Sequence, residues 1–455
     1  MADDLAVMDD DEVHADRVAA ILEAVEAGDA PRLAALLEPL HNADIADVLE
    51  QISGADRRAL LALWSEIDGE LLSEIDDSIR EEVIESLPRN VVAEAMRELD
   101  SDDVVDILED LDPPQQGIIL DALEDADRVA VQQAMAFPEG SAGRLMQREV
   151  VVAPEHWTVG EAIDFLRETE HLPDQFYHVV LIDPRLKPVG YVTLGRLLSS
   201  RREMRLKDIL EDSFRTIPVT ESEADVAYMF NQYHLISTPV VDASGRLIGV
   251  ITIDDAMNVL DEEHEQDMLR LAGVGDDSSL SDGAFATARQ RLPWLVVNLF
   301  TASISAFVIS RFESTIASLV MLAALMPIVA STGGIAGTQS LAVAVRALAT
   351  RSLTSANAKR VVMREMLGGL LNGLGLAVIL GLAGFLIFGD WKLGLVLGMA
   401  MITNQVVAAL GGVLVPLGLH RLDLDPALAS GTFVTTLTDV LGYLAFLGLA
   451  SMFLL

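Results

Sequence analysis

Asp439 is a single carboxylate inside the last long apolar segment of the chain. A lone carboxylate is expensive to bury in hydrocarbon, and such residues commonly mark the path of an ion through a membrane. The hydroxyls of Thr435, Thr436 and Thr438 lie within about one helical turn of it, and carbonyls near Gly431 could add oxygens. Mg²⁺ is a hard cation that is typically held by one or two carboxylates, often with waters retained. These residues predict a divalent cation site; the alternative is an aspartate that the threonines neutralise for packing.

A second polar stretch interrupts an apolar run at residues 331–340, S-T-G-G-I-A-G-T-Q-S. Gly333 and Gly337 form a small-residue pattern that lets membrane helices approach closely. Close packing does not explain Thr338 and Gln339, which need polar partners or water at that depth. We interpret the stretch as part of the wall of an ion path.

Both stretches require a membrane domain, which the C-terminal part of the chain supplies. Five apolar segments each reach or approach the roughly 20 residues that a helix needs to cross the hydrocarbon core. They cover about 293–311, 316–345, 366–388, 393–419 and 427–455. Eight Lys and Arg residues flank one side of these segments, against Arg311 and Lys392 on the other. The positive-inside rule then predicts a cytoplasmic N-terminal part and, because five is odd, an extracytoplasmic C-terminus. Buried helices of a soluble protein would not need this asymmetry.

The formal net charge is −39, and all but six of the 70 acidic residues lie before residue 288. So acidic a half is a poor partner for nucleic acid and attracts cations. The chain has no cysteine, no H-E-x-x-H pair and no G-x-x-x-x-G-K-[ST] loop, which argues against thiolate or zinc chemistry and against a built-in NTPase. Any transport would then be driven by the electrochemical gradient, and we do not expect an enzyme. A potential of 100 mV, negative inside, would favour entry of a divalent cation by about 4.6 kcal/mol.

The acidic half begins with residues 1–15, which are predicted to be disordered. Residues 16–137 are predicted to form short amphipathic helices, since apolar residues recur at three- and four-residue spacing. A-D-I-A-D-V-L-E at 43–50 is echoed by D-D-V-V-D-I-L-E at 102–109. Repeated helix pairs of this kind predict a small superhelical stack.

Strand-like runs alternate with helices in residues 138–205 and again in 206–258. Aligning G-Y-V-T with G-V-I-T places Gly190 on Gly249 and Thr193 on Thr252. The block resembles a tandem of cystathionine-β-synthase-type (CBS) domains, an α/β fold that often binds adenine nucleotides.

In the CBS family the last strand ends in G-h-h-T-x-x-D, whose Thr and Asp hold a ribose. The second copy keeps this motif as Gly249, Thr252 and Asp255, whereas the first copy has Arg196 in place of the Asp. The resemblance implies at most one nucleotide site, with ATP as a candidate modulator. A purely structural CBS pair is the alternative.

With helical repeats, a CBS pair and five spans in this order, residues 16–455 resemble the MgtE family of magnesium transporters and channels. The most specific motifs are R-L-P-W-L at 291–295, G-G-x-x-G-x-Q-S at 333–340 and T-T-L-T-D-V-L-G at 435–442. The resemblance implies a multidomain protein of the bacterial inner membrane. A connecting, or plug, helix at 259–290 would join the CBS pair to an all-α transmembrane domain at 291–455.

Members of this family are homodimers whose pore is lined by the second and fifth spans, and Asp439 matches the family's pore aspartate. The other pore-lining residues that the resemblance implies are Gly333, Gly334, Gly337, Thr338, Gln339, Thr435 and Thr436. The form G-G-N-T-G-N-Q, known from other members, has asparagines at the positions of Ile335 and Thr338, so the wall is less polar here. A site for a hydrated ion can pass several divalent cations, Co²⁺ among them.

The family also binds regulatory Mg²⁺ between the CBS pair and the plug helix. The residues that match those positions are Asp255, Glu263 and Asp267. Asn258 and Gln266 stand where other members carry acids. Asp102 and Asp106 share a helix face at i, i+4 and are expected partners across the domain boundary. The alternative for such a charge run is a solvated face.

The expected mechanism is negative feedback. At low internal Mg²⁺ the carboxylates of separate domains repel each other, and at high Mg²⁺ bound ions bridge them, so that the plug helix holds the pore shut. Two other functions remain open: a CBS-regulated transporter of another substrate, such as an anion, and a membrane sensor that transports nothing.

Overall fold

The computed structural model describes residues 10–109, 111–169, 172–173, 175–274, 283–422, 424–427 and 430–455. Of the predicted disordered segment 1–15, residues 1–9 lie outside this range, and the first helix begins at Asp10. The chain forms two compact units, Met1–Asp261 and Glu262–Leu455.

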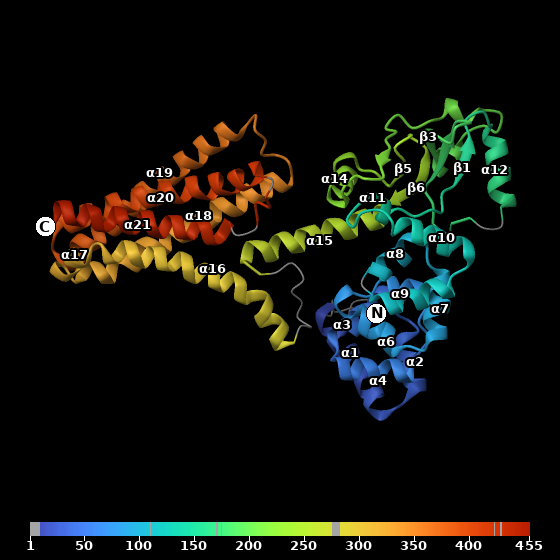
Figure 1. Ribbon diagram of the computed structural model, residues 1–455, viewed down its shortest axis with the longest axis horizontal. Coiled ribbons are helices and arrows are strands. Elements are labelled where there is room, and N and C mark those ends of the chain that lie inside the picture. The colour runs from blue at the N-terminus through green and yellow to red at the C-terminus, as the bar shows by residue number, and fades with distance from the viewer. Residues whose placement is uncertain are drawn as a thin grey trace, which may run out of the picture. The chain divides into compact units, whose positions relative to one another are not determined.

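Short helices come first in the first unit (Figure 1). They are α1 (Asp10–Ala27), α2 (Ala30–Leu37), α3 (Asn42–Gln51), α4 (Gly54–Leu63), α5 (Gly69–Ser73), α6 (Asp77–Ser86), α7 (Arg89–Glu98), α8 (Ser101–Glu109), α9 (Pro113–Ala122) and α10 (Asp125–Ala134). Several start at a polar cap; the side chains of Ser53 and Asp68, for example, accept hydrogen bonds from first-turn N–H groups. Because α4 packs against α6, α5 against α7 and α7 against α9, successive helices stack as a helical-repeat domain requires.

Two buried arginines occupy equivalent places in this stack. Each donates through Nε to a backbone carbonyl that precedes its own helix, at 2.8 Å for Arg57 and 3.1 Å for Arg80. Arg57 also pairs with Glu82 at 2.6 Å, and Arg80 with Asp106 at 2.9 Å. A buried guanidinium needs such a full set of partners. Arg57 thus joins α4 to α3 and α6, and Arg80 joins α6 to the residue Ile75 before it and to α8.

Two three-stranded sheets follow, with the orders β1-β2-β3 and β4-β5-β6. The strands are β1 (Val152–Pro154), β2 (His178–Ile182), β3 (Pro188–Thr193), β4 (Ile217–Pro218), β5 (Ser237–Val241) and β6 (Leu247–Thr252). The helices of this region are α11 (Ala142–Leu145), α12 (Val159–Glu168), α13 (Leu194–Ser199), the 3₁₀ helix η1 (Leu206–Asp208) and α14 (Glu223–Tyr233). In each sheet the first pair of strands is parallel and the second antiparallel.

The strand registers confirm the predicted repeat. His178 lies opposite Thr193 in the first sheet, and Ser237 lies opposite Thr252 in the second. The sequence alignment of the two copies therefore corresponds to a structural equivalence.

Helix α15 (Ile253–Ala272) follows β6 without a break. It is shorter than the predicted plug helix at 259–290, because Gly273 follows it with a φ of 73°, the left-handed conformation in which glycine ends helices. Residues 275–282 lie outside the described range, and the next helix begins at Ala284.

The second unit contains the helices α16 (Ala284–Ser310), α17 (Glu313–Ser318), α18 (Met321–Ala349), α19 (Ala358–Phe388), α20 (Trp391–Arg421) and α21 (Ser430–Phe453). Five of the described helices are long and apolar enough to cross a membrane, namely all of these except α17. The first begins before its predicted start at 293, since the helix continues through Arg289 and Arg291. The predicted second segment, 316–345, includes the end of α17 and the break before α18.

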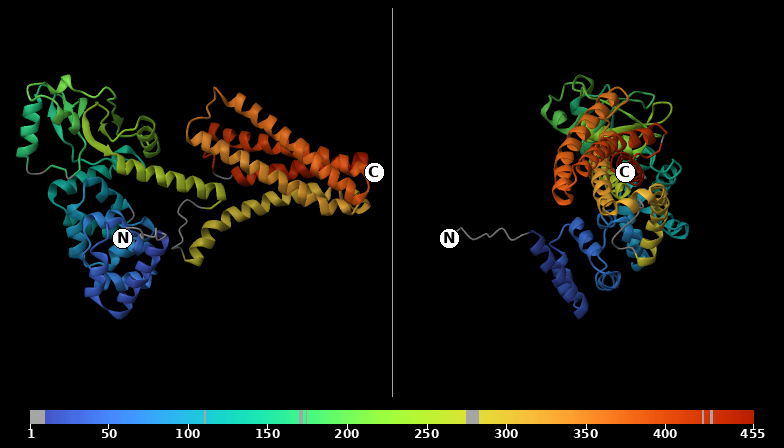
Figure 2. Two further views of the ribbon diagram at one scale, coloured as in Figure 1. Left: turned by 180° about the vertical axis from the view of Figure 1, so that it is seen from behind. Right: turned by 90° about the vertical axis from the view of Figure 1, so that its left-hand side faces the viewer.

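Helix α20 is the centre of this bundle, because it packs against α18, α19 and α21. Figure 2 shows the bundle from behind and along its helices. Glycines allow the close approach: a Cβ on Gly369 of α19 would lie 2.7 Å from the carbonyl oxygen of Gln405 in α20. The exposed side chains of α16 and α19 are largely apolar, as expected of helices that face lipid.

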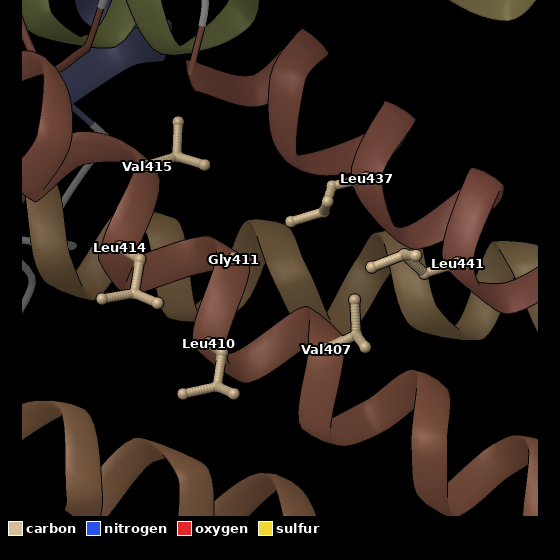
Figure 3. Close-up of a pocket in the computed structure, with 7 residues that line it drawn as sticks. All are labelled: Val407, Leu410, Gly411, Leu414, Val415, Leu437 and Leu441. Atoms are coloured by element: carbon tan, nitrogen blue, oxygen red, sulfur yellow. The ribbon is translucent and has the colours of Figure 1, made fainter. Parts of the chain in front are cut away.

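A groove of about 280 Å³ lies between α20 and α21 (Figure 3). Its lining consists of Val407, Leu410, Gly411, Leu414, Val415, Leu437 and Leu441. Because no oxygen-bearing side chain lines it, this groove offers nothing to a hard cation and is not a candidate for the ion path.

Candidate metal sites

Asp439 lies in α21 and is partly exposed. Among the described residues it forms no hydrogen bond and no ion pair. The hydroxyls of Thr435, Thr436 and Thr438 donate instead to backbone carbonyls of their own helix, at 2.9, 2.7 and 2.8 Å. The packing alternative requires these threonines to donate hydrogen bonds to the Asp439 carboxylate, and they do not. Their hydroxyl oxygens keep lone pairs that can interact with a cation.

The glycine-rich stretch of α18 lies against this part of α21. A Cβ on Gly337 would come within 2.6 Å of Val434 Cγ1, and one on Gly334 within 3.9 Å of Thr435 Cγ2. The residues predicted for the two pore-lining spans thus lie side by side within one chain. Thr338, Gln339 and Ile335 of α18 are exposed, and Thr338 lies one turn after Gly334 on the same face.

The sequence patterns did not identify two adjacent amide side chains of α20 as part of the site. Asn404 and Gln405 are buried and donate to the carbonyls of Val329 and Thr332 in α18, at 2.7 and 3.3 Å. The available signal was the N-Q pair in the middle of an apolar segment, where polar side chains are rare and need partners.

An acidic cluster lies in the first unit, where the N-terminal helices meet the second CBS copy. Burial, and then the charge of Asp255, raise the pKa of Asp102 well above its usual value. Burial and Asp100 raise the pKa of Asp103 to about 7, and burial and Asp254 raise the pKa of Asp255 to about 7. Like charges in a desolvated place disfavour ionisation, so a bound cation would stabilise the ionised cluster.

The acidic cluster does not by itself supply the ligand set of a metal site. Among the described residues, no group of three or more acidic or histidine side chains lies close enough together to hold a metal ion. Asp106, which the sequence places on one face with Asp102, pairs with Arg80 at 2.9 Å. The structure therefore brings Asp102 and Asp255 together and engages Asp106 elsewhere.

The predicted regulatory residues Glu263 and Asp267 lie one turn apart on α15. Burial, and then the charge of Asp425, raise the pKa of Asp267. Arg270 Nη1 pairs with Asp425 at 2.8 Å, and Arg270 Nη2 donates to Gln266 Oε1 at 2.9 Å. Gln266, which stands where other family members carry an acid, thus orients an arginine, whereas Asn258 is exposed.

The predicted nucleotide residues are occupied by contacts within the chain. A Cβ on Gly249 would lie 2.6 Å from Met146 Sδ, and the Thr252 hydroxyl donates to Asp255 Oδ2 at 2.8 Å. In the first copy, Arg196 pairs with Glu211 at 3.3 Å. The Asp255 carboxylate keeps further lone pairs that could accept from a ribose hydroxyl.

Models of known families match the whole arrangement. The model described as "Divalent cation transporter" matches residues 326–449, that of the MgtE intracellular N domain matches 40–140, and that of the CBS domain matches 142–203 and 206–262.

Named relatives match most of the chain. The magnesium transporter MgtE of Thermus thermophilus is 33% identical over 439 residues, 95% of this chain and 97% of that protein. The magnesium transporter MgtE of Enterococcus faecalis is 34% identical over 328 residues, 71% of each. A crystal structure of the cytosolic domain of the Mg²⁺ channel MgtE in complex with ATP aligns at 27% identity with a TM-score of 0.49, covering 53% of this chain and 99% of that one. On the sequence matches, this chain belongs to the MgtE family of magnesium transporters.

Proposed function

We propose that two copies of this chain form a pore that conducts Mg²⁺ through the inner membrane of a bacterium, with the N-terminus in the cytoplasm and the C-terminus outside. The observation that carries this proposal is the unpaired carboxylate of Asp439, beside threonine oxygens and the glycine face of α18. Protein sites for Mg²⁺ use one or two carboxylates, and a two-fold axis near Asp439 would supply the second from the other copy of the chain. The ion moves down its electrochemical gradient, and other hydrated divalent cations, such as Co²⁺, follow the same path.

The test is uptake of Mg²⁺ into liposomes that contain the full chain and a fluorescent Mg²⁺ indicator. Asp439→Asn keeps the shape and removes the charge, and we expect it to abolish uptake. Asp390→Asn is the matched control: Asp390 caps α20 by accepting from the backbone N–H of Lys392 at 2.8 Å, and asparagine caps helices equally well. Uptake by Asp439→Asn at the wild-type rate would refute the proposal.

The same experiment separates the alternatives. A sensor that transports nothing would give no Mg²⁺ flux in the wild type. A transporter of an anion would give flux of the anion and no dependence on Asp439.

We further propose that internal Mg²⁺ closes the pore by binding the acidic groups of Asp102 and Asp255 in the first unit and of Glu263 and Asp267 on α15. The raised pKa values of Asp102, Asp255 and Asp267 support this, because burial and then neighbouring carboxylates disfavour the ionised form of each group, and a bound cation would favour it. A ligand shifts a conformational equilibrium only through its preference for one state. Mg²⁺ would prefer the state in which these acids lie closest together.

This regulation is tested with Asp102→Asn and Asp255→Asn combined. We expect the internal Mg²⁺ concentration that halves uptake to rise by about tenfold or more, since each lost ligand removes a charge-assisted contact. Asp121→Asn, on the exposed face of α9, is the control. An unchanged Mg²⁺ dependence in the double variant would exclude these residues.

ATP is the proposed modulator at the second CBS copy. Thr252 and Asp255, which are joined by a hydrogen bond, would contact the ribose there. Because Asp255 also belongs to the acidic cluster, ATP and regulatory Mg²⁺ would then influence each other's binding.

A further inference from the structure

Asn404 is the most enclosed polar side chain of the described membrane unit that bonds to another helix. It is fully buried, with 0% exposure, and its Nδ2 donates to the carbonyl oxygen of Val329 in α18 at 2.7 Å. Its neighbour Gln405, 2% exposed, donates to the carbonyl of Thr332 at 3.3 Å. The two amides of α20 thus hold α18 at points about one turn apart, just where the glycine-rich stretch begins.

The side chain of Asn404 also separates two helices. A Cβ on Gly333 of α18 would lie 2.1 Å from Asn404 Nδ2, and a Cβ on Gly442 of α21 would lie 3.0 Å from Asn404 Cγ, Nδ2 and Oδ1. Gly442 comes three residues after Asp439, which is less than one helical turn. The Asn404 amide therefore fills the space between α18 and α21 beside Asp439.

Packing alone does not account for an asparagine here. Its Oδ1 is buried and has no hydrogen-bond partner among the described residues. An acceptor left in that state is unfavourable, whereas leucine has a similar shape and no unsatisfied acceptor. A buried polar group without a partner calls for a functional explanation.

We propose that Asn404 is a positioning residue for ion selectivity, which sets the distance between α18 and α21 at the level of Asp439. The inference rests on the proposed function, in which these two helices line the ion path. Mg²⁺ keeps several waters and tolerates little distortion of its octahedral shell, whereas Ca²⁺ accepts longer and more variable distances. A path of fixed width therefore favours Mg²⁺, and a path of variable width admits Ca²⁺ better.

The experiment compares Mg²⁺ and Ca²⁺ flux in the same liposomes for the wild type, Asn404→Ala and Asn404→Leu. We expect the ratio of Mg²⁺ to Ca²⁺ flux to fall by up to about tenfold in both variants, which corresponds to about 1.4 kcal/mol. Thr403→Val is the matched control, because Thr403 is exposed and donates only to Met399 of its own helix, at 3.0 Å. We expect this control to keep the wild-type ratio.

A merely structural role for Asn404 would lower the flux of both ions by the same factor, and an unchanged ratio in both variants would overturn the inference.

A double-mutant cycle tests the geometry even if Asn404→Leu does not fold. Gly333→Ala should reduce Mg²⁺ flux, and adding Asn404→Ala should restore part of it, since the new Cβ then has room. Additive losses in the cycle would also overturn the inference.

Asp439→Asn, measured in the same vesicles, separates the two proposals. If it conducts Mg²⁺ like the wild type, the proposed ion path is wrong. If it is inactive while the Asn404 variants keep the wild-type ratio, only the role of Asn404 is wrong.

Discussion

Gly337 and Gly334 are three residues apart and both lie towards α21, but the space beside each differs. A Cβ on Gly337 would meet Val434 Cγ1 at 2.6 Å, whereas a Cβ on Gly334 would find its nearest neighbour, Thr435 Cγ2, at 3.9 Å. The first distance is a clash and the second is ordinary van der Waals contact. At the scale of single residues, the close approach of α18 and α21 therefore depends on Gly337 much more than on Gly334.

We expect Gly337→Ala to destabilise the membrane unit by about 1–3 kcal/mol, the usual effect of overpacking, and to lower Mg²⁺ uptake. Gly334→Ala is the matched control and should leave both properties close to wild type. Thermal unfolding in detergent and liposome uptake measure the two effects. Equal unfolding temperatures for the two variants would contradict the packing described here.

His178 contributes a pH dependence in the first unit. Its Nδ1 shares a hydrogen bond with Ser237 Oγ of the other CBS copy, and burial lowers its pKa to about 4, against an opposing effect of Glu211. The unfolded chain, with an ordinary pKa near 6.5, binds the proton more tightly than the folded chain. The contribution of neutral His178 to stability is thus complete above about pH 6.5 and is lost as the pH falls towards 4.

Between pH 6.5 and 4 this contribution lowers the unfolding temperature of the first unit, whereas the raised pKa values of Asp102, Asp103 and Asp255 act in the opposite direction. The carboxyl effect is common to both proteins, so His178→Gln should lose less stability, or gain more, than the wild type over this range. His234→Asn is the control, since His234 is exposed with a left-handed φ of 54° that asparagine also accepts. Calorimetry of the full chain at several pH values gives the comparison. The same acid sensitivity in wild type and His178→Gln would exclude His178 as its source.

At the scale of elements, α15 connects the second CBS sheet directly to the membrane unit. It begins at the residue after β6, and within the second unit its last turn is anchored by the Arg270–Asp425 ion pair at 2.8 Å. Leu271 packs against the apolar cluster that includes Val434. Within the second unit, these contacts tie the last turn of α15 to α21.

We expect Arg270→Gln to weaken this anchor, because it leaves the carboxylates of Asp425 and Asp267 close together without their cation. The internal Mg²⁺ concentration that halves uptake should rise by several-fold, and Arg270→Lys should restore part of the wild-type response. Arg246→Gln removes a surface ion pair with Asp242 and serves as the control, since such pairs contribute little. Unchanged gating in Arg270→Gln would show that the ion pair does not act as an anchor.

At the scale of the whole molecule, charge and apolar surface are separated along the chain. All but six of the 70 acidic residues precede Ala284, where the first of the five candidate spans begins. The acidic unit carries carboxylates whose pKa values are raised by burial and by one another. Binding of divalent cations should therefore stabilise this unit, since a ligand that binds only the folded state shifts the folding equilibrium.

We expect Mg²⁺ to raise the unfolding temperature of the first unit in the full chain, and its removal by a chelator to reverse the effect. At a concentration of about 100 times its Kd, a ligand of one site adds about 2.7 kcal/mol. Na⁺ at equal ionic strength should stabilise less, because it screens the charges without bridging them. Equal stabilisation by Mg²⁺ and Na⁺ would indicate screening alone and argue against specific sites.

The sequence by itself determined the features that depend on local patterns. Apolar segment lengths gave the five candidate spans, and strand patterns gave the CBS repeat, in which Thr193 and Thr252 occupy equivalent register positions. Asp439 stood out because a carboxylate in an apolar segment is conspicuous without any knowledge of its neighbours.

Only the tertiary structure decided which groups partner one another. It engaged Asp106 with Arg80 and anchored Arg270 on Asp425, and it placed Asn404 between Gly333 and Gly442. These contacts join residues that are distant in the chain. Periodicity fixes the face of a helix on which a residue lies, but the helix that covers that face depends on how all the elements pack together.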